Sequence, residues 1–69
     1  MPIYKVSYVI PQIPRGGAIL TQEDPPQVGD IITLDNRKYR VIEVVELLPP
    51  QRGIHFFHAT IVPVSRGLT

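Results

Sequence analysis

The 69 residues predict a single all-β domain built from five short strands. Two observations lead to this class. Five apolar segments are rich in β-branched and aromatic residues, which suit a pleated sheet. The 8 prolines and 5 glycines gather between these segments, where they mark turns. A chain of this length has room for one hydrophobic core, so we expect residues 1–69 to form one domain.

The first strand is predicted over residues 3–10, where only Lys5 and Ser7 are polar. Alternation places every second side chain on the same face, so we expect burial on one side. The buried face should carry Tyr4, Val6, Tyr8 and Ile10. Residues 11–17 hold two prolines and two glycines and predict a loop, and residues 18–21 predict a short second strand.

Residues 22–28 predict an acidic, proline-stiffened connector that leads through Gly29-Asp30 into a hairpin. The hairpin strands are expected at residues 31–34 and 38–48, joined by the turn residues 35–37. The apolar alternation slips phase within the second arm, which predicts a bulge or bend at residues 41–43. An amphipathic helix is the competing interpretation, but β-branched residues and the following Pro49-Pro50 favour a strand.

Residues 49–53 predict a tight connection into the last strand, at residues 54–62, and Pro63 ends that strand. The last strand has apolar residues on both faces. One barrel interior cannot absorb both, so we expect the surplus to lie at a subunit interface or under a loop. Residues 64–69 lack apolar periodicity and predict a flexible tail.

Five strands without room for a helix after Asp30 predict a small five-stranded barrel or a strongly twisted antiparallel sheet. Val28-Gly29-Asp30 and the hairpin that runs from it to Val44 resemble the opening of small SH3-like barrels. In those domains the Gly-Asp pair starts a strand, and the equivalent of Tyr39-x-Val41 packs into the barrel. The resemblance implies architecture only, because such barrels occur in ribosomal, phage-assembly and signalling proteins.

Composition narrows the function classes. Seven Lys and Arg against six Asp and Glu give a net charge of +1, which creates no strong field toward an anionic partner. Cysteine is absent, which excludes disulfides and thiolate metal sites within the chain. No apolar run approaches the roughly 20 residues of a membrane span, and no leader is recognised. We therefore expect a cytoplasmic protein with neither membrane contact nor cofactor.

Basic residues offer one candidate binding surface. Arg37, Lys38 and Arg40 cluster at one hairpin tip, Arg52 occupies another connection, and Tyr39 lies among the first three. Cations interleaved with an aromatic ring are typical of nucleic-acid surfaces. A solvated hairpin tip with Tyr39 in the core is the simpler interpretation.

The last strand offers the other candidate surface, a homo-oligomer or protein-partner interface. Its predicted members are Ile54, Phe56, Phe57, Ile61 and Val62. Small domains without disulfides are only marginally stable, which favours self-association.

No residues in the sequence form a recognisable catalytic or metal site. His55 and His58 are three residues apart on a strand, as are Glu43 and Glu46, so each pair should occupy opposite faces. No nucleophile motif is present. The sequence therefore predicts a noncatalytic binding or assembly module that self-associates through an apolar strand face, with a nucleic-acid-binding barrel as the alternative.

Overall fold

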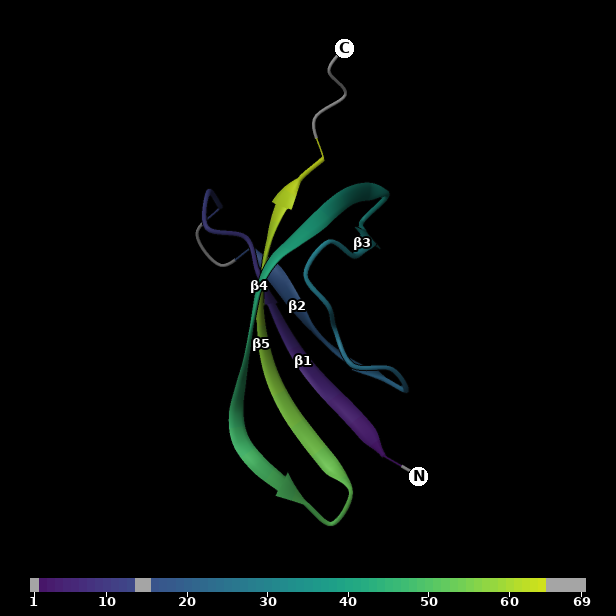
Figure 1. The fold of residues 1–69 in the computed structure, drawn as a ribbon. Helices are drawn as coiled ribbons and strands as arrows, with labels where there is room; N and C mark the ends of the chain where they lie inside the picture. The colour runs from purple at the N-terminus through teal and green to yellow at the C-terminus, as the bar shows by residue number, and fades with distance from the viewer. Residues whose placement is uncertain (1, 14–15, 65–69) are drawn as a thin grey trace.

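The computed structural model describes residues 2–13 and 16–64 and contains five β-strands (Figure 1). Their bounds are Ile3–Val9 (β1), Gly17–Gln22 (β2), Ile31–Leu34 (β3), Arg37–Gln51 (β4) and Ile54–Pro63 (β5). The all-β prediction is confirmed. Among the described residues, no helix has the length and apolar character needed to cross a membrane.

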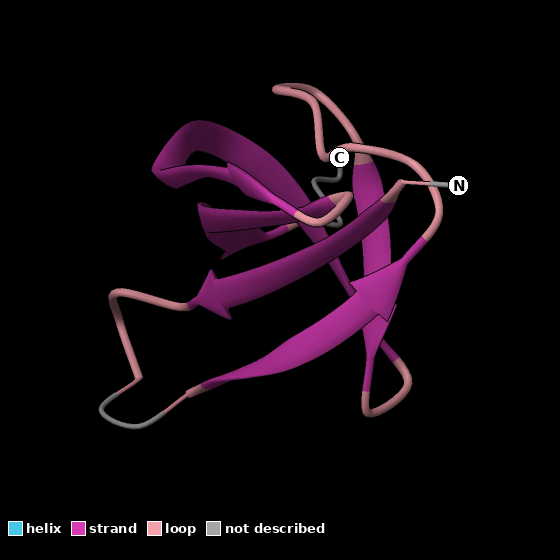
Figure 2. Cartoon of the chain, turned by 90° about the horizontal axis from the view of Figure 1, so that it is seen from below, coloured by secondary structure: helices cyan, strands magenta, loops and turns pink. Residues whose placement is uncertain are grey.

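The strands form one sheet in the order β2-β1-β5-β4-β3, and this sheet curls into a half-barrel (Figure 2). Neighbouring strands are antiparallel except β1 and β5, which pair in parallel. The parallel pair follows from the odd number of strands, because every connection reverses the chain and the fifth strand regains the direction of the first. The barrel-like prediction is confirmed, and the alternative of an antiparallel sheet is corrected to a mixed one.

Two-residue turns close both hairpins of β4. Asp35 and Asn36 link β3 to β4 with φ of 52° and 65°, and Arg52 and Gly53 link β4 to β5 with φ of 54° and 79°. Two successive positive φ values indicate a type I′ turn, whose twist matches that of the strands. Asp, Asn and Gly adopt this conformation readily, whereas Arg52 is strained in it.

A β-bulge resolves the phase slip in the first half of β4. The register with β5 shifts between Val41 and Glu43, and Ile42 is the extra residue. Ile42 is 48% exposed, whereas Val41 is fully buried and Val44 packs against the core. The predicted bulge is confirmed, and the helical alternative is wrong.

Two further register shifts follow, between Glu46 and Leu48 and between Leu48 and Gln51. The second accommodates Pro49 and Pro50, which lie inside β4. The predicted connection at residues 49–53 is therefore corrected to a shorter turn. Bulges and edges are the positions of a sheet that tolerate proline, because no continuous ladder of N–H donors is needed there.

The core lies on the inner side of the half-barrel. Its buried members are Val6, Tyr8, Ile10, Tyr39, Val41, Ala59 and Ile61. The face predicted for β1 is confirmed, although Tyr4 at its start is only half-buried. Tyr39 packs in the core, which confirms the simpler interpretation of this residue.

The connector from β2 to β3 carries one buried residue, Pro26, while its neighbours are exposed. Its end extends the pairing of β3 with β4. The Gly29 N–H donates to the Val41 carbonyl at 2.8 Å, and the Val41 N–H donates to the Asp30 carbonyl at 2.9 Å. After Val41, no strand of the described part of the chain pairs with β4 on the side away from β5.

The pairing of β5 with β4 continues just past the end of β5. The N–H of Val64, the first residue of the predicted flexible tail, donates to the Lys38 carbonyl at 2.9 Å. The rest of that tail, residues 65–69, lies outside the described residues, as do residues 14 and 15 of the predicted loop.

Candidate functional site

The outer face of the sheet, opposite the core, carries apolar side chains near one end of β1, β5 and β4. The register places Ile54 of β5 beside Ile3 of β1, and Phe56 of β5 beside Leu48 of β4. Val45 of β4 lies on the same face. We call these five residues the outer patch. Ile3, Val45 and Leu48 are each at least 40% exposed, so no described segment covers them.

The five predicted interface residues divide between the two faces of β5. Ile54, Phe56 and Val62 lie on the outer face and are partly exposed, whereas Phe57 and Ile61 lie on the inner face. Ile61 is fully buried, and Phe57 packs against the core. The expectation is corrected for Ile61, because packing within the chain already covers it. The apolar residues of β5 on the inner face thus pack into or against the core, whereas those on the outer face stay partly exposed.

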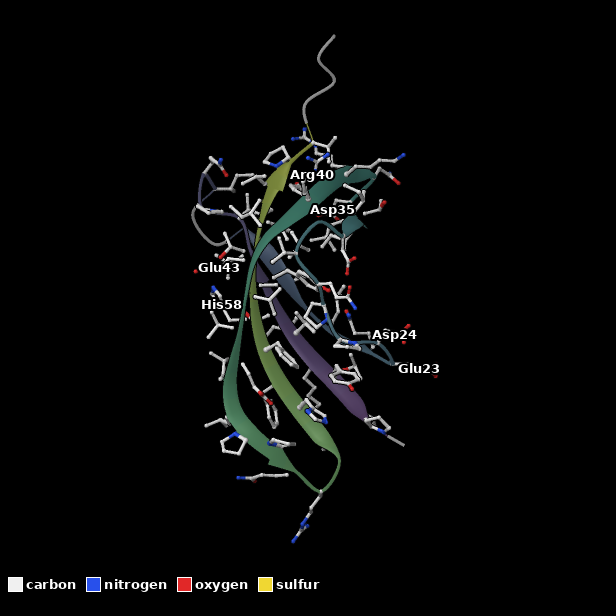
Figure 3. All side chains as sticks on the ribbon, in the orientation of Figure 1. Glu23, Asp24, Asp35, Arg40, Glu43 and His58 are labelled. Atoms are coloured by element: carbon white, nitrogen blue, oxygen red, sulfur yellow. The ribbon has the colours of Figure 1, made fainter. Side chains whose placement is uncertain are left out.

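A polar contact separates Val62 from the outer patch. The Thr60 hydroxyl donates to Glu43 Oε1 at 3.3 Å, and Val62 lies beyond it, beside Arg40. Glu43 and His58 point to the same side of the sheet (Figure 3). His58 and Thr60 lie between Phe56 and Val62 on the outer face of β5, so Val62 is not part of the outer patch.

Three residues of the outer patch were not predicted as interface residues. Ile3 joins the patch through the parallel pairing of β1 with β5, and Val45 and Leu48 join it through the register of β4 after its bulges. Neither pairing is readable from a single segment. The apolar content of residues 41–48 indicated that this segment packs against other parts of the protein. The sequence did not determine which face of the segment is buried.

The basic residues predicted to bind nucleic acid do not form one surface. Arg37, Lys38 and Arg40 are exposed at the start of β4, whereas Arg52 lies in the turn at its far end. At about 3.3 Å per residue, the extended strand separates Arg40 from Arg52 by on the order of 30–40 Å. Tyr39 is buried and cannot stack on a base. What remains is the start of β4, with three exposed cations next to a two-residue turn.

An aromatic cluster occupies the inner side of the sheet beyond the core. Tyr4 and His55 stack with ring centroids 4.7 Å apart, and Phe57 lies 6.0 Å from Tyr4 and 6.4 Å from His55. His55 Nδ1 is 3.7 Å from Glu46 Oε2. His58 lies on the outer face, so the two histidines occupy opposite faces, as predicted.

A shallow hollow of about 440 Å³ lies between the start of β1 and the connector after β2. Its lining consists of Pro2, Ile3, Glu23 and Asp24. The two carboxylates lie on the side of the molecule away from Glu43 (Figure 3). All four lining residues are exposed, so the hollow is a solvated surface feature.

The buried ring of Tyr8 links the core to the edge strand β2. Its hydroxyl donates to Gln22 Oε1 at 2.9 Å, and Gln22 Nε2 donates to the Asp24 carbonyl at 2.8 Å. Burial raises the pKa of the Tyr8 hydroxyl above its ordinary value, and the nearby Asp30 carboxylate acts in the same direction. Tyr8 therefore serves the fold as a neutral hydrogen-bond donor.

Within residues 2–13 and 16–64, no three His, Asp or Glu side chains lie together as ligands for a metal ion. Comparison of the chain with protein-family models, with curated proteins and with solved structures found no match. The geometry of the sheet is therefore the basis for a functional assignment, and the outer patch is its most distinctive surface.

Proposed function

We propose that this chain is a noncatalytic binding or assembly module that self-associates through the outer patch. The observation that carries the proposal is the exposure of apolar side chains that lie side by side on β1, β5 and β4. The largest apolar patch on the surface of a soluble protein is often a functional site. The proposed place of assembly is the cytoplasm.

The size of the patch sets the expected strength of the contact. Three strands about 4.8 Å apart and seven residues at about 3.3 Å each cover on the order of 300 Å² of sheet. A standard interface buries about 800 Å² per partner, so the patch is the centre of a contact and not all of it. We therefore expect reversible association with a Kd on the order of 1–100 μM.

The chemistry of the patch favours a second copy as the partner. All five members of the patch are uncharged, so placing the patch against itself buries no unpaired charge. A twofold contact of this kind needs the same surface on both subunits. The nearest charged side chain by register is Lys5, which lies beside Phe56 and can remain at the rim.

The test uses two adjacent leucines as a matched pair. Leu48 belongs to the outer patch, whereas Leu47 is the unpaired residue at a register shift; they are 51% and 55% exposed. Leu48→Lys should weaken association at least about tenfold, because a contact must then bury a charge or exclude it. Leu47→Lys should change it little. Light scattering over a hundredfold concentration range measures both.

A native chain that stays monomeric across this range would overturn the proposal. Equal weakening by both leucine variants would also count against it, since a general effect of added charge would then explain the result. The alternative partner, nucleic acid bound by Arg37, Lys38 and Arg40, would instead show affinity that falls steeply with salt and is lost when these residues are replaced.

A further inference from the structure

The two edges of the half-barrel differ in their protection against pairing with another strand. One edge is formed by β3, which is only four residues long, and by the second half of β4. That half of β4 carries two register shifts, two prolines and Glu46. Short strands, bulges, prolines and charges are the devices by which proteins keep an edge from pairing.

β2 forms the other edge and has none of these devices. Its six residues, Gly-Ala-Ile-Leu-Thr-Gln, include no charge and no proline. Its register with β1 runs from Tyr4↔Gln22 to Val9↔Gly17 without a shift. Ile19, at its centre, is 75% exposed, the highest value among the large apolar side chains of the described residues. This strand is an open template for a further strand.

The hydrogen bonds of β1 identify which backbone groups of β2 are free. The Ile3 N–H donates to the Gly53 carbonyl, at the start of β5, at 2.8 Å. Odd-numbered residues of β1 therefore bond to β5, and even-numbered residues bond to β2. The Ile10 N–H donates to the Gly16 carbonyl at 3.4 Å, which independently gives the same assignment.

Even-numbered residues of β1 lie opposite Ala18, Leu20 and Gln22. The backbone groups of those three residues are therefore used by the β1–β2 ladder. In an antiparallel ladder the residues between them direct their N–H and C=O groups away from the neighbour. Gly17, Ile19 and Thr21 thus present three donors and three acceptors at the open edge.

We infer that β2 pairs antiparallel with β2 of a second copy, with Ile19 opposite Ile19 and Gly17 opposite Thr21. This register is symmetric about a twofold axis, as an isologous contact requires. Each of the three residue pairs exchanges two backbone hydrogen bonds, so every outward donor and acceptor finds a partner. No like charges meet, because the strand carries none.

The inference rests on the proposed function, since it too concerns self-association, but it uses a different surface. Edge pairing places the two sheets side by side and leaves the outer patch of each copy free. A six-residue edge is a smaller contact than a standard interface and acts together with the patch. Two different twofold contacts on one chain close into a tetramer of dihedral symmetry where their axes are perpendicular and intersect, and otherwise link copies into an open array.

Amide hydrogen exchange of the native chain tests the pairing directly. Exchange rates are measured by NMR at two protein concentrations about twentyfold apart, so that mass action shifts the population of the assembly. Protection of the Ile19 and Thr21 amides should rise severalfold at the higher concentration. The Ala18 and Leu20 amides, which already bond to β1, provide the internal reference and should change much less.

Two substitutions at one position supply the matched control. Thr21→Pro removes an outward donor and should abolish the concentration-dependent protection of Ile19, while an edge strand tolerates the proline. Thr21→Val keeps the donor and should preserve the effect. Unchanged chemical shifts of the core residues show that each variant is folded.

The outcomes separate this inference from the proposed function. Association without added protection at Ile19 and Thr21 would overturn the edge pairing and leave the outer patch as the contact. Association that survives Thr21→Pro with Ile19 still protected would also overturn it. A native chain that remains monomeric at both concentrations would overturn both proposals together.

Discussion

The two halves of β4 belong to one strand but have different surroundings. The first half, up to Val44, lies between β3 and β5 and contributes Tyr39 and Val41 to the core. The second half, from Val45 to Gln51, has β5 as its only strand neighbour in the described chain and is exposed at every residue. Both halves are rich in Val, Ile or Leu. Neighbouring strands, not composition, decide which half contributes to the core and which half stays exposed.

The largest expected effect compares two valines four residues apart on β4. Val41 is 1% exposed and Val45 is 44% exposed. Val41→Ala should lower the free energy of unfolding by about 2 kcal/mol, from lost apolar burial and the cavity left behind. Val45→Ala should lower it by less than about 0.5 kcal/mol. Thermal unfolding measures both, and equal losses would show that the second half is packed as tightly as the first.

A smaller effect is expected at the contact between the core strand β1 and the edge strand β2. Tyr8→Phe removes the hydrogen bond to Gln22 and should cost about 1 kcal/mol at neutral pH. Because burial raises the pKa of Tyr8, the folded state holds its proton more firmly than the unfolded state. The stability that comes from this difference in pKa is complete below about pH 10 and is lost as the pH rises above that value.

Native protein should therefore lose more stability than the Tyr8→Phe variant when the pH is raised above about 10. Denaturant unfolding at neutral pH and at alkaline pH measures the difference. Parallel losses in the two proteins would contradict the assignment of the shift to Tyr8.

The smallest effect compares the turns at the two ends of β4. Arg52 has a φ of 54° in a type I′ turn, where the other turn has Asp35 and Asn36. Arg52→Asn should raise the free energy of unfolding by about 0.5–1 kcal/mol, because Asn tolerates a left-handed backbone. In the other turn, Asn36→Arg places Arg at the second left-handed position and should lower the free energy of unfolding by a similar amount. Thermal unfolding measures the stability of both variants. Changes of the same sign would contradict the expected difference between the two turns.

The sequence was sufficient for features that depend on one segment. Alternation in β1 predicted the burial of Val6, Tyr8 and Ile10, and the phase slip at residues 41–43 predicted the bulge at Ile42. Turn residues predicted the hairpin at Asp35 and Asn36. Each of these follows from side-chain period or from local backbone preference.

Features that depend on two distant segments were not predictable in this way. The β1–β5 pairing brings Ile3 beside Ile54, and the later register shifts of β4 bring Leu48 beside Phe56. Most of the candidate site depends on these pairings. The sequence therefore identified Ile54 and Phe56, but not Ile3 and Leu48 beside them. Phe57 and Ile61 were grouped with them because composition alone does not distinguish the two faces of β5.

The strand order β2-β1-β5-β4-β3 also constrains the order in which the sheet folds. During synthesis β1 and β2 can form one hairpin and β3 and β4 another, but no strand joins them until β5 has left the ribosome. The two hairpins therefore remain separate until β5 pairs with both β1 and β4, and the sheet closes in one late, long-range step.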